Sequence, residues 1–275
     1  MRAVIPMLLL AGACKPAAQA PAAPASAVPV GLASPSAARV AAASASASAS
    51  AGMARAVSES NASYSFAYAY PAAAAAIPAL KDWLDADLAK SRKEVASEAH
   101  EAKQDAAANG YPFNPHSSET KWQVVADLPG WLSLSALTSG YSGGAHGNYG
   151  FIALLWDRQA GQRREPASLF ASKAALAKAL TPAFCAELNR QRATKRGEPV
   201  DPASTDPFDQ CIDPTGSTLI LGSADHQHFT RIGVLIGPYE AGSYAEGSYE
   251  VTLPVTPAVL AAVRPEFRAA VAVKR

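Results

Sequence analysis

The segment Gly140-Tyr141-Ser142-Gly143-Gly144 has the G-x-S-x-G pattern of a nucleophilic serine. That pattern works when the serine lies on a sharp turn from a strand into a helix, which exposes its hydroxyl above a parallel sheet. Here the chain continues through Ala145-His146-Gly147 directly into another apolar run, with no helix in between. The glycines are better explained by a turn that requires positive φ angles. Ser142 is therefore kept as the nucleophile of an alternative, hydrolytic function.

Three histidines form a second candidate site for chemistry. His146 either acts at an open cleft or bonds a backbone carbonyl to fix its turn, and we favour the structural interpretation. His226 and His228 project from one face of an extended segment, so His146 as a third ligand would complete an open zinc site. Asp225 would then orient an imidazole. No Cys or Glu lies at ligand spacing, so the sequence predicts no metal and no cofactor, and this zinc site joins the hydrolytic alternative.

The stretch 238–254, Pro-Tyr-Glu-Ala-Gly-Ser-Tyr-Ala-Glu-Gly-Ser-Tyr-Glu-Val-Thr-Leu-Pro, predicts a hairpin-like core from its turn residues and its alternation. Tyr249 belongs to the buried face of its strand. Tyrosine offers rigid area with a polar tip, which suits recognition, so for Tyr244 and Glu246 both recognition and a structural role stay open. The candidate binding residues are Tyr141, His146, Asn148, Tyr239, Glu240, Tyr244 and Glu246.

The elements that must position these residues follow from periodicity. Thr181-Pro182 fits an N-cap followed by proline at the first helical position, so the helical stretch 168–196 is expected to be two helices. The apolar run 149–156 is expected to be a central strand covered on both faces. Helices are predicted over 73–107 and from Pro257, and further strands over 63–70, 122–128, 132–138, 217–221, 229–236 and 248–254. The order predicts one α+β domain, a largely antiparallel sheet with packed helices.

The N-terminus has the features of an export signal. Arg2, the apolar run 4–10 and small residues precede Cys14, so residues 1–13 are expected to be a signal peptide and Cys14 the lipidated new N-terminus. An incidental cysteine after an ordinary signal remains the alternative, because Ala11 holds the place usually taken by Leu. Residues 14–60 are expected to be a disordered tether rich in Ala, Ser and Pro, followed by the domain at 61–275.

Export predicts which membrane holds the protein and whether its cysteines are oxidised, and the charge indicates which partners it has. Lys15 after the anchor, rather than Asp, favours the outer membrane of a Gram-negative bacterium. In the oxidising periplasm Cys185 and Cys211 are expected to form a disulfide, which closes a loop of about 26 residues and contributes about 3 kcal/mol. The net charge is +1 and the basic residues are scattered, so nothing indicates a general nucleic-acid surface. The basic cluster 190–196 is expected to form a solvated helix end.

Three segments together resemble one known family: 141–148 with its Gly-Gly-x-His turn, 154–170 with Leu-Leu-Trp-Asp, and 238–254 with Pro-Tyr-x-x-Gly-x-Tyr. They are similar to the extracytoplasmic domain shared by the RsiV anti-sigma factor and the PdaC peptidoglycan deacetylase, over residues of about 60–265. The resemblance implies a secreted or membrane-tethered protein. In RsiV this domain binds lysozyme, and in PdaC it accompanies a separate catalytic domain. We expect this chain to lack that catalytic domain and the transmembrane and sigma-binding parts of an anti-sigma factor.

These observations favour a non-enzymatic periplasmic lipoprotein. Its domain is expected to bind an envelope protein or glycan, with a lysozyme-like muramidase or peptidoglycan as candidates, and to meet the membrane through the lipid anchor only. The alternative is an envelope hydrolase that uses Ser142 or a His146/His226/His228 zinc site.

Overall fold

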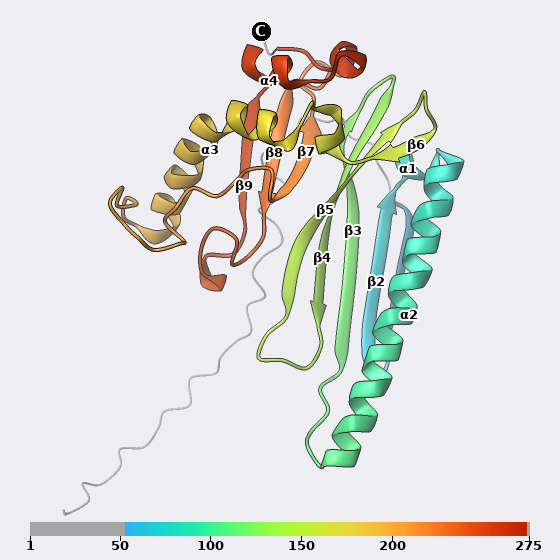
Figure 1. Ribbon diagram of the computed structural model, residues 1–275. Helices are drawn as coiled ribbons and strands as arrows, with labels where there is room; N and C mark the ends of the chain where they lie inside the picture. The colour runs from blue at the N-terminus through green and yellow to red at the C-terminus, as the bar shows by residue number, and fades with distance from the viewer. Residues whose placement is uncertain (1–52, 274–275) are drawn as a thin grey trace, which may run out of the picture. The chain divides into compact units, whose positions relative to one another are not determined.

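The structure is a computed structural model that describes residues 53–273. The predicted signal peptide, Cys14 and most of the predicted tether lie outside the described residues. The fold is α+β, as predicted, with two sheets (Figure 1). The first sheet contains, in chain order, β1 (Met53–Ser60), β2 (Tyr64–Pro71), β3 (His116–Asp127), β4 (Trp131–Tyr141), β5 (Asn148–Asp157) and β6 (Gln162–Arg164). The second contains β7 (Thr218–Gly222), β8 (Arg231–Ile236) and β9 (Tyr249–Pro254).

The strand pairing is antiparallel except between β2 and β3. A parallel pair needs a long crossover, and the helix α2 (Pro78–Asn109), which follows the short α1 (Ala72–Ala75), provides it. The remaining helices are α3 (Lys173–Arg196) and α4 (Pro257–Ala262), with short 3-10 turns η2 (Pro166–Leu169), η3 (Tyr244–Glu246) and η4 (Pro265–Ala270). None of the helices within residues 53–273 is long and apolar enough to cross a membrane.

The alternation of β2 places its aromatic residues under α2. Phe66, Tyr68 and Tyr70 are buried, as the period of two in the sequence predicts. The Tyr68 hydroxyl donates a hydrogen bond of 2.7 Å to Asp87 on the helix and accepts one of 2.9 Å from the Trp122 indole on β3. The Tyr68 hydroxyl and the Trp122 indole are therefore both hydrogen-bonded. These bonds link α2 to the parallel strands β2 and β3.

Two hydrophobic cores meet at the end of β5. Leu154 and Trp156 point into the core beneath α2, whereas Leu155 points into the core formed by the second sheet, α3 and α4. In Figure 1 α3 lies beside the second sheet and α2 runs along the first. Because successive residues of a strand face opposite sides, this short segment belongs to both cores.

Three predictions about elements need correction. The ordered chain begins before Asn61, because residues 55–60 of β1 pair antiparallel with β2. The first half of β5 is not covered on both faces: α2 packs on β2 and β3, and Ile152 remains 38% exposed.

The third correction concerns α3, which is one helix rather than two and contains Pro182 in its interior. Its N-cap is Ser172, whose side chain accepts from the Ala175 amide. Pro182 lies on the exposed side of the helix, and the Thr181 hydroxyl donates to the Ala177 carbonyl instead of capping a new helix. Burial of the apolar face outweighs the local signal of Thr-Pro, as tertiary packing often does.

Candidate functional site

Two loops bring three predicted ring residues together. His146 lies in the connection between β4 and β5, and Tyr239 and Tyr244 lie in the connection between β8 and β9. The rings of His146 and Tyr244 stack with centroids 4.1 Å apart, and those of Tyr244 and Tyr239 are 5.5 Å apart. We call these three residues the aromatic ridge. Each of the three was a predicted binding residue, but no pattern in the sequence indicated that their rings touch.

The turn that carries His146 is held by one backbone carbonyl. Gly147 O lies 2.8 Å from His146 Nδ1 and accepts a hydrogen bond of 2.7 Å from the Tyr244 hydroxyl. The first contact is the one that the structural interpretation of His146 predicted. A Cβ at Gly147 would lie 3.1 Å from the Gly140 carbonyl oxygen, so glycine is needed for the two strands to approach here.

Tyr239 is the exposed end of the ridge. Its side chain is 52% exposed, and its backbone has φ of 66°. Few residues other than glycine adopt this left-handed conformation, and strain of this kind gathers at functional sites. The ridge therefore presents one strained, solvent-facing tyrosine supported by two stacked rings.

The predicted acidic binding residues are occupied within the loop itself. Glu240 accepts hydrogen bonds from the Gly237 amide at 3.0 Å and the Ser217 hydroxyl at 2.6 Å. Glu246 accepts from the Ser243 amide at 2.9 Å, from Arg196 Nε at 2.8 Å and from the Tyr249 hydroxyl. These two carboxylates shape the loop, and their hydrogen-bonding capacity is used within the protein.

The surroundings of Glu246 alter two pKa values. Partial burial alone would raise the pKa of the Glu246 carboxyl, but hydrogen bonds from Arg196, Tyr249 and the Ser243 amide lower it to about 2. Burial, together with the bond to Glu246, raises the pKa of Tyr249 to about 12. Glu246 is therefore ionised and Tyr249 protonated across the neutral range, which maintains the charge-assisted bond between them.

Arg192 of α3 holds the connection between β8 and β9 in place, and it was not among the predicted site residues. Its side chain is fully buried, although the basic cluster was expected to be solvated. Nε donates to the Ala241 carbonyl at 2.9 Å, Nη1 to Asn189 Oδ1 at 2.9 Å and to the Asp209 carbonyl at 3.2 Å, and Nη2 to the Gln210 carbonyl at 3.0 Å. A signal was present, because Arg192 continues the four-residue spacing of Leu176, Leu180, Phe184 and Leu188 on the buried face.

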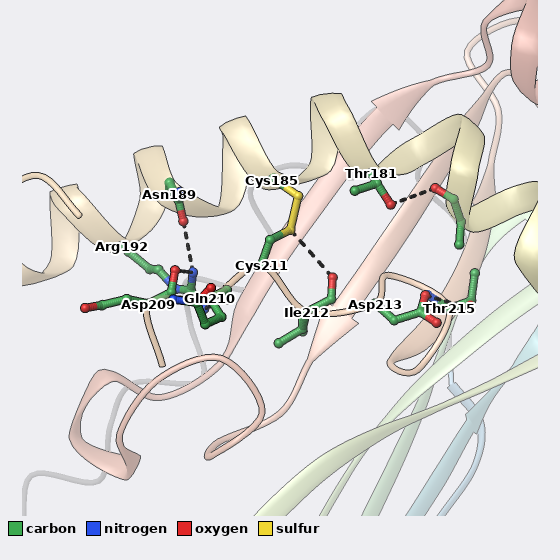
Figure 2. Close-up of a disulfide and its surroundings, with 11 residues drawn as sticks. Thr181, Cys185, Asn189, Arg192, Asp209, Gln210, Cys211, Ile212, Asp213 and Thr215 are labelled. Carbon is green, nitrogen blue, oxygen red and sulfur yellow. Dashed lines mark hydrogen bonds between the residues drawn. A yellow bond between two sulfur atoms is a disulfide. The ribbon is translucent and has the colours of Figure 1, made fainter. Parts of the chain in front are cut away.

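The predicted disulfide joins α3 to the segment that Arg192 holds. Cys185 and Cys211 are bonded, with Cα atoms 5.5 Å apart. Figure 2 shows the disulfide beside Asp209, Gln210 and Arg192, which lies along the same helix. Arg196 adds ion pairs with Asp209 and, at 2.8 Å, with Glu246. Helix α3, the loop after it and the loop of the ridge are thus one connected unit.

The other predicted residues lie apart from the ridge. Tyr141 and Ser142 line a cleft against α2, and no described hydrogen bond joins Ser142 to a histidine. The chain after Ser142 enters β5 rather than a helix, as expected. Asn148 accepts a bond from the Tyr149 amide through its side chain at 2.9 Å.

The zinc site of the hydrolytic alternative does not form within the described residues. No group of three or more His, Cys, Asp or Glu between residues 53 and 273 is placed to hold a metal ion. Asp225 does orient an imidazole, at 3.0 Å from His228 Nδ1, but it also accepts from the backbone amides of Gln227 and His228. Those bonds close the turn between β7 and β8, which explains the spacing of the two histidines without a metal.

Comparison with known proteins agrees with part of the resemblance. Residues 57–149 match the family model described as Deacetylase PdaC. The similarity to PdaC that the sequence indicated is therefore confirmed over residues 57–149, the part of the chain that this model matches.

Two solved structures are also similar. A DUF3298 family member from Bacteroides fragilis is 15% identical, with a TM-score of 0.43, over 74% of this chain and 91% of that one. A DUF3298 family protein from Pseudomonas aeruginosa is 14% identical, with a TM-score of 0.42, over 79% of this chain and 96% of that one. No curated protein matches the sequence.

Proposed function

We propose that this protein is a non-enzymatic binding domain of the cell envelope, and that the aromatic ridge contacts the ligand. The observation that carries the proposal is the contact between two loops in which His146 stacks on Tyr244 and the exposed Tyr239 lies tilted against Tyr244. Aromatic faces bind sugar rings and form the centres of protein interfaces. Peptidoglycan and a lysozyme-like muramidase are the candidate ligands.

The way in which the ridge is held supports recognition. The loop from Gly237 to Ser248 is fixed by Arg192, Glu240 and Glu246, so little ordering entropy is lost when a ligand binds. Preorganisation of this kind raises affinity without new contacts. No observation favours hydrolysis in the same way, because Ser142 has no described base.

We also propose that the domain lies in the periplasm, anchored to the outer membrane through a lipid on Cys14. This part of the proposal is supported by the N-terminal sequence, in which a short apolar run and small residues precede that cysteine. Metabolic labelling with a fatty acid tests it: label is expected on the wild-type protein and not on Cys14→Ser. Labelling of both proteins, or of neither, would contradict the anchor.

The binding proposal is tested by co-sedimentation with insoluble peptidoglycan and by pull-down with lysozyme. Tyr239→Ala is expected to weaken binding to the true ligand about tenfold or more, the effect of removing an interface anchor. Tyr111→Ala is the matched control, because Tyr111 is similarly exposed but lies in the loop after α2. Binding to neither ligand, or equal loss in both variants, would reject the ridge.

A further inference from the structure

A separate polar cleft of about 300 Å³ lies between α2 and the first sheet. Glu94 and Glu98 line it from the helix, and His116, at the start of β3, lines it from the sheet. Tyr141 and Ser142, at and just after the end of β4, complete the wall. Its volume is at the lower end of the range for small-molecule sites. The G-x-S-x-G segment thus faces this cleft, whereas His146 faces the ridge.

The charge of the cleft is negative. Glu94 and Glu98 are one helical turn apart, so both side chains emerge on the same side of α2. Lys90 Nζ lies 3.5 Å from Glu94 Oε1, but no ion pair or hydrogen bond to Glu98 is found within residues 53–273, and no Lys or Arg lines the cleft. The serine and tyrosine hydroxyls can both donate and accept. The lining is therefore suited to a cation that carries hydrogen-bond donors.

His116 brings a buried ring nitrogen without a hydrogen-bond partner to the same cleft. Its side chain is only 5% exposed, and its Nδ1 has no hydrogen-bond partner in the described part of the chain. Alternation along β3 puts its ring on the same face as the buried Trp122, between the sheet and α2. An unpaired buried polar atom costs about 1–3 kcal/mol. Because His116 lines the inner wall of the cleft, a donor group that penetrates to its ring would remove that cost.

We infer that this cleft binds a small ligand with a primary ammonium group. The ammonium donates one hydrogen bond to the Glu98 carboxylate and one to His116 Nδ1, and the hydroxyl of Tyr141 or Ser142 accepts the hydrogen bond from its third N–H group. An ammonium has three donors and no acceptor, which matches a lining of carboxylates, hydroxyls and an unpaired ring nitrogen. The inference is independent of the aromatic ridge and of its ligand.

The test is a titration of the full-length protein with n-butylamine, followed by NMR of the His116 ring. Uncharged n-butanol, of nearly the same shape, is the control ligand. We expect saturable shifts with a Kd of about 1 mM, consistent with the affinity of so small a ligand. The absence of saturation well above that concentration, or equal binding of n-butanol, would overturn the inference.

Two carboxylate variants locate the site. Glu98→Gln is expected to weaken butylamine binding about tenfold, since one charge-assisted bond is lost. Glu101→Gln lies on the same helix, bonds Ser97 and does not line the cleft, so it should bind as the wild type does. Unchanged binding by Glu98→Gln would overturn the inference. Tyr239→Ala should leave amine binding intact, so failure of the ridge and failure of the cleft are distinguishable.

Discussion

At the scale of residues, three cations of α3 turn towards the protein rather than towards water. Arg192 is enclosed by carbonyl oxygens, Arg196 lies between two carboxylates, and Lys195 lies 3.8 Å from the centroid of the Tyr249 ring. A buried guanidinium is tolerated only when its donors are paired. The position of the loop after β8 therefore depends on individual donors as well as on the apolar contact of Ala241.

Arg192→Met tests that dependence. It leaves the Ala241, Asp209 and Gln210 carbonyls without their donor, and it should reduce the free energy of unfolding by about 3 kcal/mol. Arg190→Met is the control, because Arg190 pairs only with Glu187 on the exposed side of the same helix, and a change below about 1 kcal/mol is expected. Urea denaturation measures both. Equal losses would show that Arg192 contributes no more than a surface charge.

The lowered pKa of Glu246 predicts a pH effect with a defined sign. Its carboxyl has a pKa of about 2 in the folded protein against an ordinary 4.5. Its contribution to stability is therefore complete above about pH 4.5 and is lost as the pH falls towards 2. Glu246→Gln should cost about 2 kcal/mol at neutral pH and make the unfolding free energy less dependent on pH in that window. Glu119→Gln, at an exposed position, should leave the profile unchanged.

At the scale of elements, the disulfide fixes the loop after α3 to the helix. The bond closes a separation of 26 residues, which should contribute about 3 kcal/mol to stability in the chain-entropy model. The variant Cys185→Ser/Cys211→Ser should lose that amount in urea denaturation. A reducing agent should lower the stability of the wild type by the same amount and leave the variant unaffected. If the wild type is insensitive to reduction, the bond does not constrain the unfolded chain.

The sequence predicted elements best where a pattern is local. The alternation in 63–70 and the paired cysteines needed no knowledge of neighbours, and both predictions are confirmed. β1 was missed because residues 56–60 carry few large apolar side chains, so this strand is stabilised by pairing with β2 rather than by its own composition. The aromatic ridge could not be predicted as a unit, because His146 and Tyr244 are far apart in the chain and meet only through tertiary packing.

At the scale of the whole described domain, the two cores share strand β5. Leu154 and Trp156 serve the core under α2, and Leu155, between them, serves the core under α3. A strand cannot leave one core without displacing its residues from the other, because its pleat fixes alternate side chains on opposite faces. Residues 53–273 should therefore unfold as one unit, despite having two sheets.

Tryptophan positions allow that cooperativity to be measured. Trp131 packs on Phe229 and Phe267, at 6.0 and 5.9 Å between centroids, whereas Trp83, Trp122 and Trp156 belong to the core under α2. In the variant Trp131→Phe, fluorescence then follows only the core under α2, while far-UV circular dichroism follows both cores. We expect the two urea midpoints to coincide, the usual test of a two-state transition.

Leu155→Ala extends the same test to the shared strand. Removing this fully buried side chain should cost about 3 kcal/mol and move both midpoints together. Leu84 lies only in the core under α2. Leu84→Ala should also move both midpoints together, because a loss of stability in either core of a cooperative unit destabilises the whole unit. If Leu84→Ala moved the fluorescence midpoint and left part of the circular dichroism transition in place, the second sheet with α3 would be an independent folding unit, and β5 would be only a contact between two domains.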